Sequence, residues 1–195
     1  MKRCPRLFLP LLCLVLLAPA AFAGLDRDPD SMGIYFDTAG NFNCSTLPPF
    51  TPANAYLLLA NPTAPTGGFA CRIAMVGGPY FLFSTDLGGR LDIDAALDGF
   101  MVSGATPYPV ASSHIVLATF NVMLQSPDYL AFYVKPPVPP YGTCPGPVVF
   151  GTGGAVRCCG VSSGDVNLPV AGWNSPNCPV AHEARSFGAI KSLYR

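Results

Sequence analysis

Residues 54–75 read NAYLLLANPTAPTGGFACRIAM, and this stretch decides the fold class. Asn54–Ala60 is apolar on both of its faces, which is typical of a strand in the middle of a covered sheet. Pro62 ends that strand, because proline has no N–H to donate to a neighbouring strand. Turn-forming residues fill 63–68, and a second strand with alternating faces follows them. We interpret the two strands as a hairpin in which Phe69, Cys71, Ile73 and Met75 share one face.

The rest of the chain repeats this pattern of short apolar runs between turn residues. Such runs predict further strands at 32–37, 80–84, 99–103, 113–125, 129–135, 148–150, 155–158 and 166–171. The run 113–125 is expected to form another hairpin with 129–135, and its inward face should be Val116, Ala118, Phe120, Val122 and Leu124. We therefore predict an all-β fold, a single antiparallel β-sandwich of the immunoglobulin-like kind, with eight or nine strands and proline-rich crossings.

The two ends of the chain differ from the middle. Three basic residues precede an apolar run at 7–17, and a small-x-small site ends at Ala23. This order predicts a signal peptide over 1–23, so the mature protein is expected to be secreted or periplasmic. The sandwich domain is then 24–181, and 182–195 form a tail. In that tail a short C-terminal helix is predicted, because four apolar residues recur at helical spacing: Phe187, Ile190, Leu193 and Tyr194.

Length and charge narrow the classes of partner. Removing 23 of the 195 residues leaves 172, which suits one domain with a real core. The predicted signal carries three of the 11 basic residues and none of the 11 acidic ones, so the net charge of the mature chain is about −3. Since no basic stripe is present, nucleic acid is excluded as a partner. No second long apolar run follows, so no transmembrane anchor is expected in the mature chain.

Six cysteines lie beyond the predicted signal: Cys44, Cys71, Cys144, Cys158, Cys159 and Cys178. An even number in an exported chain predicts disulfides, here three, although the spacing leaves the pairing open. Position favours Cys44 with Cys71, while the neighbours Cys158 and Cys159 should each take a different partner from the remaining two. Zinc binding is the alternative, but the chain has no Cys-x-x-Cys pair among these six.

The sequence lacks the motifs of common catalytic sites. It has no nucleophile elbow, no phosphate-binding loop and no dinucleotide fingerprint, and its histidines are His114 and His182. We therefore predict a non-enzymatic protein with no catalytic residue and no cofactor. The alternative is a secreted hydrolase that uses aspartates such as Asp92 and Asp94.

Two groups of aspartates could instead bind a metal. They are Asp26, Asp28 and Asp30 in the leading segment, and Asp86, Asp92, Asp94 and Asp98 in the middle of the chain. The first group lacks the glycine and the distal glutamate of a calcium loop. The second group fits a solvated sheet edge on which the alternating Leu91 and Ile93 face inward. We interpret both groups as solvated carboxylates, and we predict no metal site.

Aromatic side chains are the candidates for recognition: Tyr80, Tyr129, Tyr133, Tyr141 and Trp173. Such rings dominate the energetics of protein interfaces and of sugar-binding surfaces. We therefore expect a binding or structural module whose partner is an exported protein or a carbohydrate. The alternative is that most of these rings pack over the sheets.

The strands at 55–61, 68–76 and 115–124 resemble those of cohesin modules, which are secreted β-sandwiches. The chain also looks like small exported bacterial proteins that begin with a segment like 28–37 and end with one like 186–195. The resemblance implies a cohesin-like fold, a bacterial origin and binding of a partner module without catalysis. No dockerin-recognition residue can be matched here, and the cysteines depart from the cohesin pattern.

Overall fold

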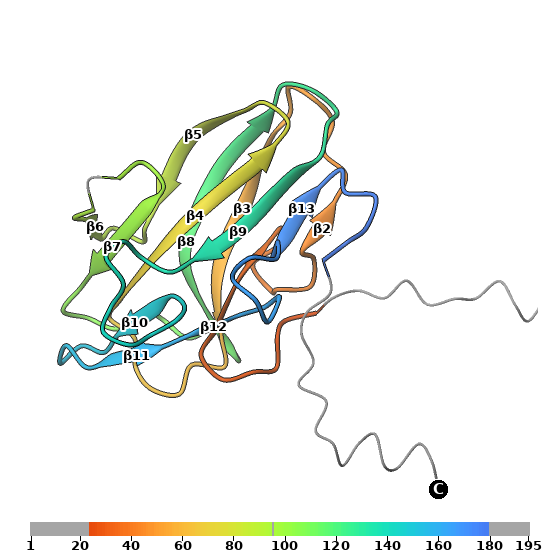
Figure 1. The fold of residues 1–195 in the computed structure, drawn as a ribbon. Coiled ribbons are helices and arrows are strands. Elements are labelled where there is room, and N and C mark those ends of the chain that lie inside the picture. The colour runs from red at the N-terminus through yellow and green to blue at the C-terminus, as the bar shows by residue number, and fades with distance from the viewer. Residues whose placement is uncertain (1–23, 95, 180–195) are drawn as a thin grey trace, which may run out of the picture.

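The computed structural model describes residues 24–94 and 96–179, which form an all-β fold (Figure 1). Its strands are β1 (Ser31–Tyr35), β2 (Cys44–Ser45), β3 (Pro52–Ala60), β4 (Gly68–Gly77), β5 (Tyr80–Asp86), β6 (Leu91–Asp92), β7 (Gly99–Ser103), β8 (His114–Leu124), β9 (Leu130–Lys135), β10 (Val148–Phe150), β11 (Val156–Cys158), β12 (Gly160–Val161) and β13 (Ala171–Trp173). The predicted signal peptide and C-terminal helix lie outside the described residues. No helix that could cross a membrane occurs in the part of the chain that the structure describes.

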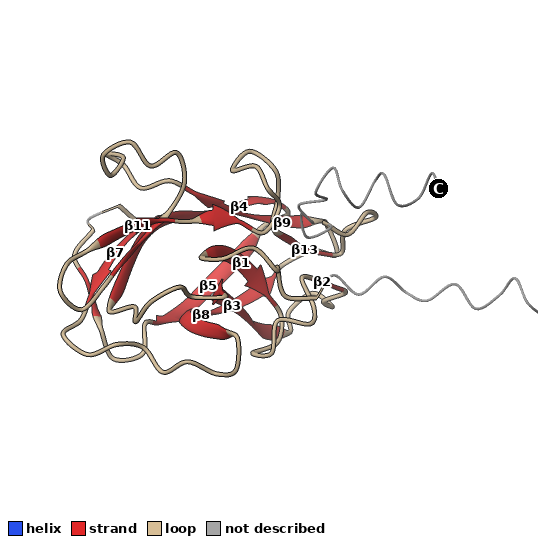
Figure 2. Ribbon diagram, turned by 90° about the horizontal axis from the view of Figure 1, so that it is seen from below, coloured by secondary structure: helices blue, strands red, loops and turns tan. Residues whose placement is uncertain are grey.

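The strands form two sheets that pack face to face, and Figure 2 shows these two layers. The smaller sheet has the order β12-β1-β3-β8-β5. The larger sheet has the order β11-β10-β4-β9-β13-β2. β7 pairs with the other edge of β4, away from β10 and β9, and β6 pairs with β7. All pairings are antiparallel except β1 with β12 and β13 with β2. The predicted β-sandwich is thus confirmed, although the described residues form thirteen strands rather than eight or nine.

Both predicted hairpins are wrong. β3 lies in the smaller sheet between β1 and β8, whereas β4 lies in the larger sheet beside β9. In the same way β8 and β9 belong to different sheets. The links at 61–67 and 125–129 therefore cross from one sheet to the other. An alternating pattern shows which face of a strand is buried, but it does not show whether the next strand pairs beside it or packs opposite to it.

The core lies between the sheets and contains the predicted face of β4: Phe69, Cys71, Ile73 and, at its margin, Met75. The predicted face of β8 is correct from Ala118 to Leu124 but wrong before it. A β-bulge lies in the β3–β8 ladder at this point, because Leu57 is opposite Ala118 whereas Leu58 is opposite Val116. The extra residue reverses the alternation, so Ile115 and Leu117 join the core while Val116 is only partly buried.

The predicted strand at 166–171 is also wrong. Asp165 begins a turn there, in which its carbonyl accepts from the Leu168 N–H and its carboxylate accepts from the Asn167 N–H. The strand β13 starts only at Ala171. Its Trp173 is 1% exposed and stacks on Phe36, with ring centroids 4.8 Å apart, and it meets Phe132 edge-on at 5.0 Å.

The disulfides differ from the expected pairing. Cys44 is bonded to Cys178, which joins β2 to the segment after β13, and Cys144 is bonded to Cys158. The predicted pairing of Cys44 with Cys71 is wrong, because Cys71 points from β4 into the core while β2 lies at the far edge of the same sheet. Cys159 is also a free, buried thiol, so the described residues contain two disulfides rather than three.

The two free thiols should be unreactive until the protein unfolds. Burial raises the pKa of Cys159 to about 12 and raises that of Cys71 even further, and a protonated thiol is a poor nucleophile. In protein cleaved after Ala23, we expect a thiol reagent at pH 8 to label no cysteine in the native state and two per chain in denaturant. Peptide mapping should assign the label to Cys71 and Cys159. Finding no thiol after unfolding would show that these two are bonded.

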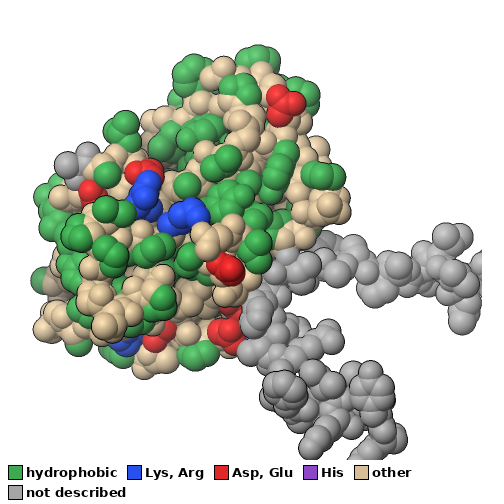
Figure 3. Space-filling model, viewed as in Figure 1, with side chains coloured by type: hydrophobic (Ala, Val, Ile, Leu, Met, Phe, Trp, Pro, Cys, Tyr) green, Lys and Arg blue, Asp and Glu red, His purple; other side chains and the backbone are tan. Residues whose placement is uncertain are grey.

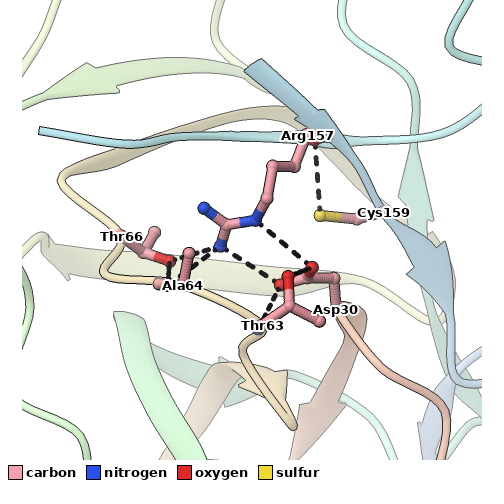
Figure 4. A network of polar contacts seen from close by, with 6 residues as sticks. All are labelled: Asp30, Thr63, Ala64, Thr66, Arg157 and Cys159. Atoms are coloured by element: carbon pink, nitrogen blue, oxygen red, sulfur yellow. Dashed lines mark hydrogen bonds and ion pairs between the residues drawn. The ribbon is translucent and has the colours of Figure 1, made fainter. Parts of the chain in front are cut away.

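The leading segment is fastened to the sandwich by a polar network around Asp30 (Figure 4). The Asp30 carboxylate accepts two hydrogen bonds from the Arg157 guanidinium, both 3.2 Å long, and others from the N–H and hydroxyl of Thr63. Arg157 also donates to the Ala64 carbonyl and to the Thr66 hydroxyl. Asp30 and Asp26 are both buried, so the interpretation of this segment as a solvated terminus is wrong. The network joins β1, the 61–67 crossing and β11.

Candidate functional site

The candidate site is the outer face of the larger sheet, formed by β6, β7, β4 and β9 and turned toward the viewer in Figure 1. Side chains alternate across a strand, so each residue between two core residues points outward here. On β4 these are Arg72, Ala74 and Val76, which are paired with Lys135, Tyr133 and Ala131 of β9. We call this surface the outer sheet face.

The outer sheet face continues on the other side of β4. Met101 of β7 is paired with Ala70, and the Ile93 N–H donates to the Met101 carbonyl, so Ile93 lies beside Met101. Ile93 and Leu91 are 64% and 73% exposed, so the prediction that they face inward is wrong, and Val76 is exposed as well. Figure 3 shows hydrophobic side chains spread around two neighbouring basic side chains on this face. A sheet surface that exposes this many apolar groups is a candidate for recognition.

The two basic side chains at the centre are held differently. The Arg72 guanidinium forms an ion pair with Asp98, and its Nε donates to the same carboxylate at 3.0 Å. This hydrogen bond raises the pKa of Arg72, so the residue stays charged. The Lys135 ammonium donates to the Val166 carbonyl at 3.0 Å and lies 5.2 Å from the centroid of the Tyr133 ring. The Lys135 ammonium thus lies beside an aromatic ring, with no carboxylate paired to it among the described residues.

The five aromatic candidates do not form one cluster. Tyr133 and Tyr129 both lie on the outer sheet face, the latter over Gly172, where a Cβ would come within 2.6 Å of the Tyr129 ring. Tyr80 lies on β5 in the other sheet, and Tyr141 packs against Phe150 with ring centroids 5.2 Å apart. The interpretation of Trp173 as an exposed binding residue is wrong, because its ring fills the core.

The aspartates that the hydrolase alternative would use, Asp92 and Asp94, accept hydrogen bonds from backbone N–H groups. The Asp92 carboxylate accepts from the N–H groups of Asp94 and Met101, and the Asp94 carboxylate accepts from the Ala96 N–H. Asp98 is paired with Arg72. Among the described residues, no group of three His, Cys, Asp or Glu side chains could hold a metal ion. These hydrogen bonds are those of turns that close the β6–β7 connection.

Sequence reasoning missed most of the outer sheet face. Met101, Ile93 and Arg72 were not among the expected binding residues, although Met101 and Arg72 alternate with core residues. The signal that could have found them is the apolar residue on the outward side of a strand, since that side of an antiparallel sheet is usually polar. Using it would have required knowing that β4, β7 and β9 lie side by side.

Comparison with known proteins gives matches among solved structures alone. No protein-family model and no curated protein matches the sequence. The second type II cohesin module from the adaptor ScaA scaffoldin of Acetivibrio cellulolyticus matches with 13% identity and a TM-score of 0.46, over 84% of this chain and 98% of that one. A type II cohesin domain from the cellulosome of the same organism matches with 12% identity and a TM-score of 0.44, over 75% and 96%. Both are cohesin modules.

Proposed function

We propose that this protein is a non-enzymatic binding module that holds a protein partner on the outer sheet face. The observation that carries the proposal is the arrangement around Arg72. Arg72, held by Asp98, is paired with Lys135 of β9, and Tyr133 is the next outward residue on that strand. On the other side of β4, Met101 of β7 is paired with Ala70, and Ile93 lies beyond it on the same face. Tyr, Met and Arg are the residues in which the centres of protein interfaces are enriched.

The charges on this face indicate the chemistry of the partner. Asp98 already neutralises Arg72, whereas Lys135 has only a carbonyl acceptor within the residues that the structure describes. A partner surface that is complementary to the outer sheet face would place apolar side chains over Met101 and Ile93 and a carboxylate beside Lys135. Burying the unpaired ammonium against anything else would leave a charge without a partner, which is costly. An acidic protein surface with apolar residues at its centre therefore fits better than a carbohydrate.

We further propose that the protein acts outside the cytoplasm. Two observations support export: the signal pattern that ends at Ala23, and the two disulfides, which persist in oxidising compartments. The partner is then expected among exported proteins. A secreted or periplasmic place of action follows from the same two observations.

Exchange of Tyr133 for alanine should weaken partner binding strongly. Partners captured from the exported proteins of the source cells would be identified by mass spectrometry, purified and titrated by calorimetry. We expect Tyr133→Ala to raise Kd by roughly thirtyfold, because central aromatic residues contribute about 2 kcal/mol or more. Arg72→Glu should do the same, since it also leaves Asp98 without its cation.

Matched controls separate a loss of the surface from a loss of the fold. Phe50→Ala removes an exposed ring outside the outer sheet face, and Arg27→Glu makes the same charge change on the leading segment. Both should bind like the wild type. Equal affinity of all four variants would contradict the proposed face. A hydrolytic activity that Asp92→Asn abolishes would contradict the non-enzymatic function.

A further inference from the structure

The strand β5 leaves a long apolar edge open. Within the described residues it pairs with β8 and with no other strand, so its second edge lies at the margin of the smaller sheet (Figure 1). Four consecutive large residues are exposed there: Tyr80 by 37%, Phe81 by 55%, Leu82 by 42% and Phe83 by 56%. No charged side chain occurs in β5 before Asp86 at its end. Natural proteins usually guard such edges with charges, because an open apolar edge is a template for another strand.

The ladder between β5 and β8 shows which backbone groups this edge offers. The Gln125 N–H donates to the Pro79 carbonyl at 2.9 Å, so the backbone of Pro79 is directed toward β8. In an antiparallel ladder these directions alternate, so Phe81 also points toward β8 while Tyr80 and Leu82 point away from it. The N–H and carbonyl groups of Tyr80 and Leu82 are therefore directed outward. At Leu82/Ser84 a bulge interrupts the ladder, and at the other end the Gly78 N–H already donates to the Tyr129 carbonyl at 2.8 Å.

We propose that β5 binds β5 of a second copy of this chain, in an antiparallel pair with its two-fold axis at Phe81. In this register Tyr80 is opposite Leu82 of the partner subunit, and each such pair exchanges two hydrogen bonds. The outward backbone groups of both residues are thereby all satisfied. The occupied Gly78 N–H on one side and the bulge on the other limit the pairing to this short window on both copies.

The side chains fit the same register. Phe81 and the partner's Phe81 are directly opposite as a pair without hydrogen bonds, in which Cβ atoms come within about 4.5–5.5 Å. Phe83, whose ring centroid lies 6.4 Å from that of Phe81, covers the pair from the side. Because the window carries no charge, self-pairing brings no like charges together. The contact is isologous, so it closes at two copies and does not propagate into fibres.

The size of the contact predicts a weak dimer. Aromatic side chains bury roughly 150–250 Å² when fully covered, so four half-exposed residues provide on the order of 400 Å² per copy. Stable interfaces bury about 600 Å² or more on each partner. We therefore expect a dimer that exchanges rapidly and is half formed at roughly 100 μM.

Sedimentation velocity over concentrations from about 10 μM to about 1 mM tests the dimer. We expect the sedimentation coefficient of the wild type to rise with concentration from that of a monomer to that of a dimer. Phe81→Glu places two carboxylates opposite each other on the axis, so it should weaken dimerisation at least about tenfold. Leu168→Glu makes a similar change on a residue that is 53% exposed and remote from β5, and it should leave the dimer intact.

A second measurement makes the test independent of the variant. Amide hydrogen exchange of Tyr80 and Leu82 in the wild type should slow as concentration rises, while that of Phe81 should stay constant. Circular dichroism melting shows whether Phe81→Glu keeps the fold. A wild type that stays monomeric at the highest concentration would overturn the proposal. So would a dimer that forms equally well with Phe81→Glu, or a β5 edge that is occupied only when another protein is bound.

Discussion

Loss of the Cys44–Cys178 disulfide should lower the free energy of unfolding by about 4–5 kcal/mol. The bond closes a loop with a sequence separation of 134, so its removal releases a large conformational entropy in the unfolded chain. It also fastens β2, which is only two residues long and pairs with β13 through Gly172 and Trp173. The double variant Cys44→Ser, Cys178→Ser would be compared with the wild type by urea unfolding under non-reducing conditions.

The second disulfide supplies the matched control. Cys144 and Cys158 are separated by only 14 residues, so replacing both by serine should cost about 3 kcal/mol. The difference between the two double variants isolates the effect of loop length from that of losing two sulfur atoms. A larger loss from the short loop would show that local packing, and not chain entropy, determines the contribution of each bond.

Replacing Arg157 by methionine should destabilise the protein by about 3–5 kcal/mol. The side chains of Arg157 and Asp30 are only 19% and 11% exposed, so removal of the cation leaves a carboxylate buried without its partner. Methionine keeps most of the volume, which limits the loss of packing. Thermal and urea unfolding would both report the change.

An exposed ion pair provides the comparison for Arg157. Arg72 and Asp98 have side chains that are 37% and 39% exposed, and pairs of this kind contribute about 0–1 kcal/mol. Arg72→Met makes the same substitution in a pair that water still reaches, so it should barely change stability. If the two variants lost equal stability, burial would not be the reason that the Asp30 network matters.

The Asp30 network should also make stability depend on pH. Burial alone would raise the pKa of Asp30, but the hydrogen bonds from Arg157 and Thr63 outweigh it and hold this pKa below its usual value of 3.8. A carboxyl whose pKa is lower in the folded state stabilises the fold fully above its unfolded pKa, and loses that effect as pH falls through the folded value. Acid unfolding of the wild type should therefore show a loss below about pH 4 that Arg157→Met lacks.

The sequence contained enough information for the fold class. Short apolar runs between proline and glycine predicted strands, and β7 and β10 have the predicted bounds. The inward face of β4 was predictable as well, because its alternation is uninterrupted from Phe69 to Met75. The reversal on β8 was not, since the bulge at Leu57/Leu58 belongs to the pairing of β3 with β8 and not to either strand alone.

The outer sheet face was predictable only in fragments. Tyr133 lies on β9 and Tyr129 comes just before that strand, four residues away, so their common face can be read from the residues alone. Arg72 and Lys135, however, are 63 residues apart and become neighbours only because β4 pairs with β9. Trp173 illustrates the opposite error, because a ring expected on the surface forms part of the core.

The sequence by itself determined that this protein is an all-β sandwich, because burial of alternating apolar residues requires a second sheet opposite the first. Only the tertiary structure decided which strands pair, which cysteines meet and which side chains share the outer sheet face. The physical reason is that alternation is a local property of a few residues, whereas pairing joins strands of any separation. Cys44 is bonded to Cys178 rather than to Cys71 because β13 pairs with β2 and brings the segment with Cys178 beside it, while β4 holds Cys71 in the core.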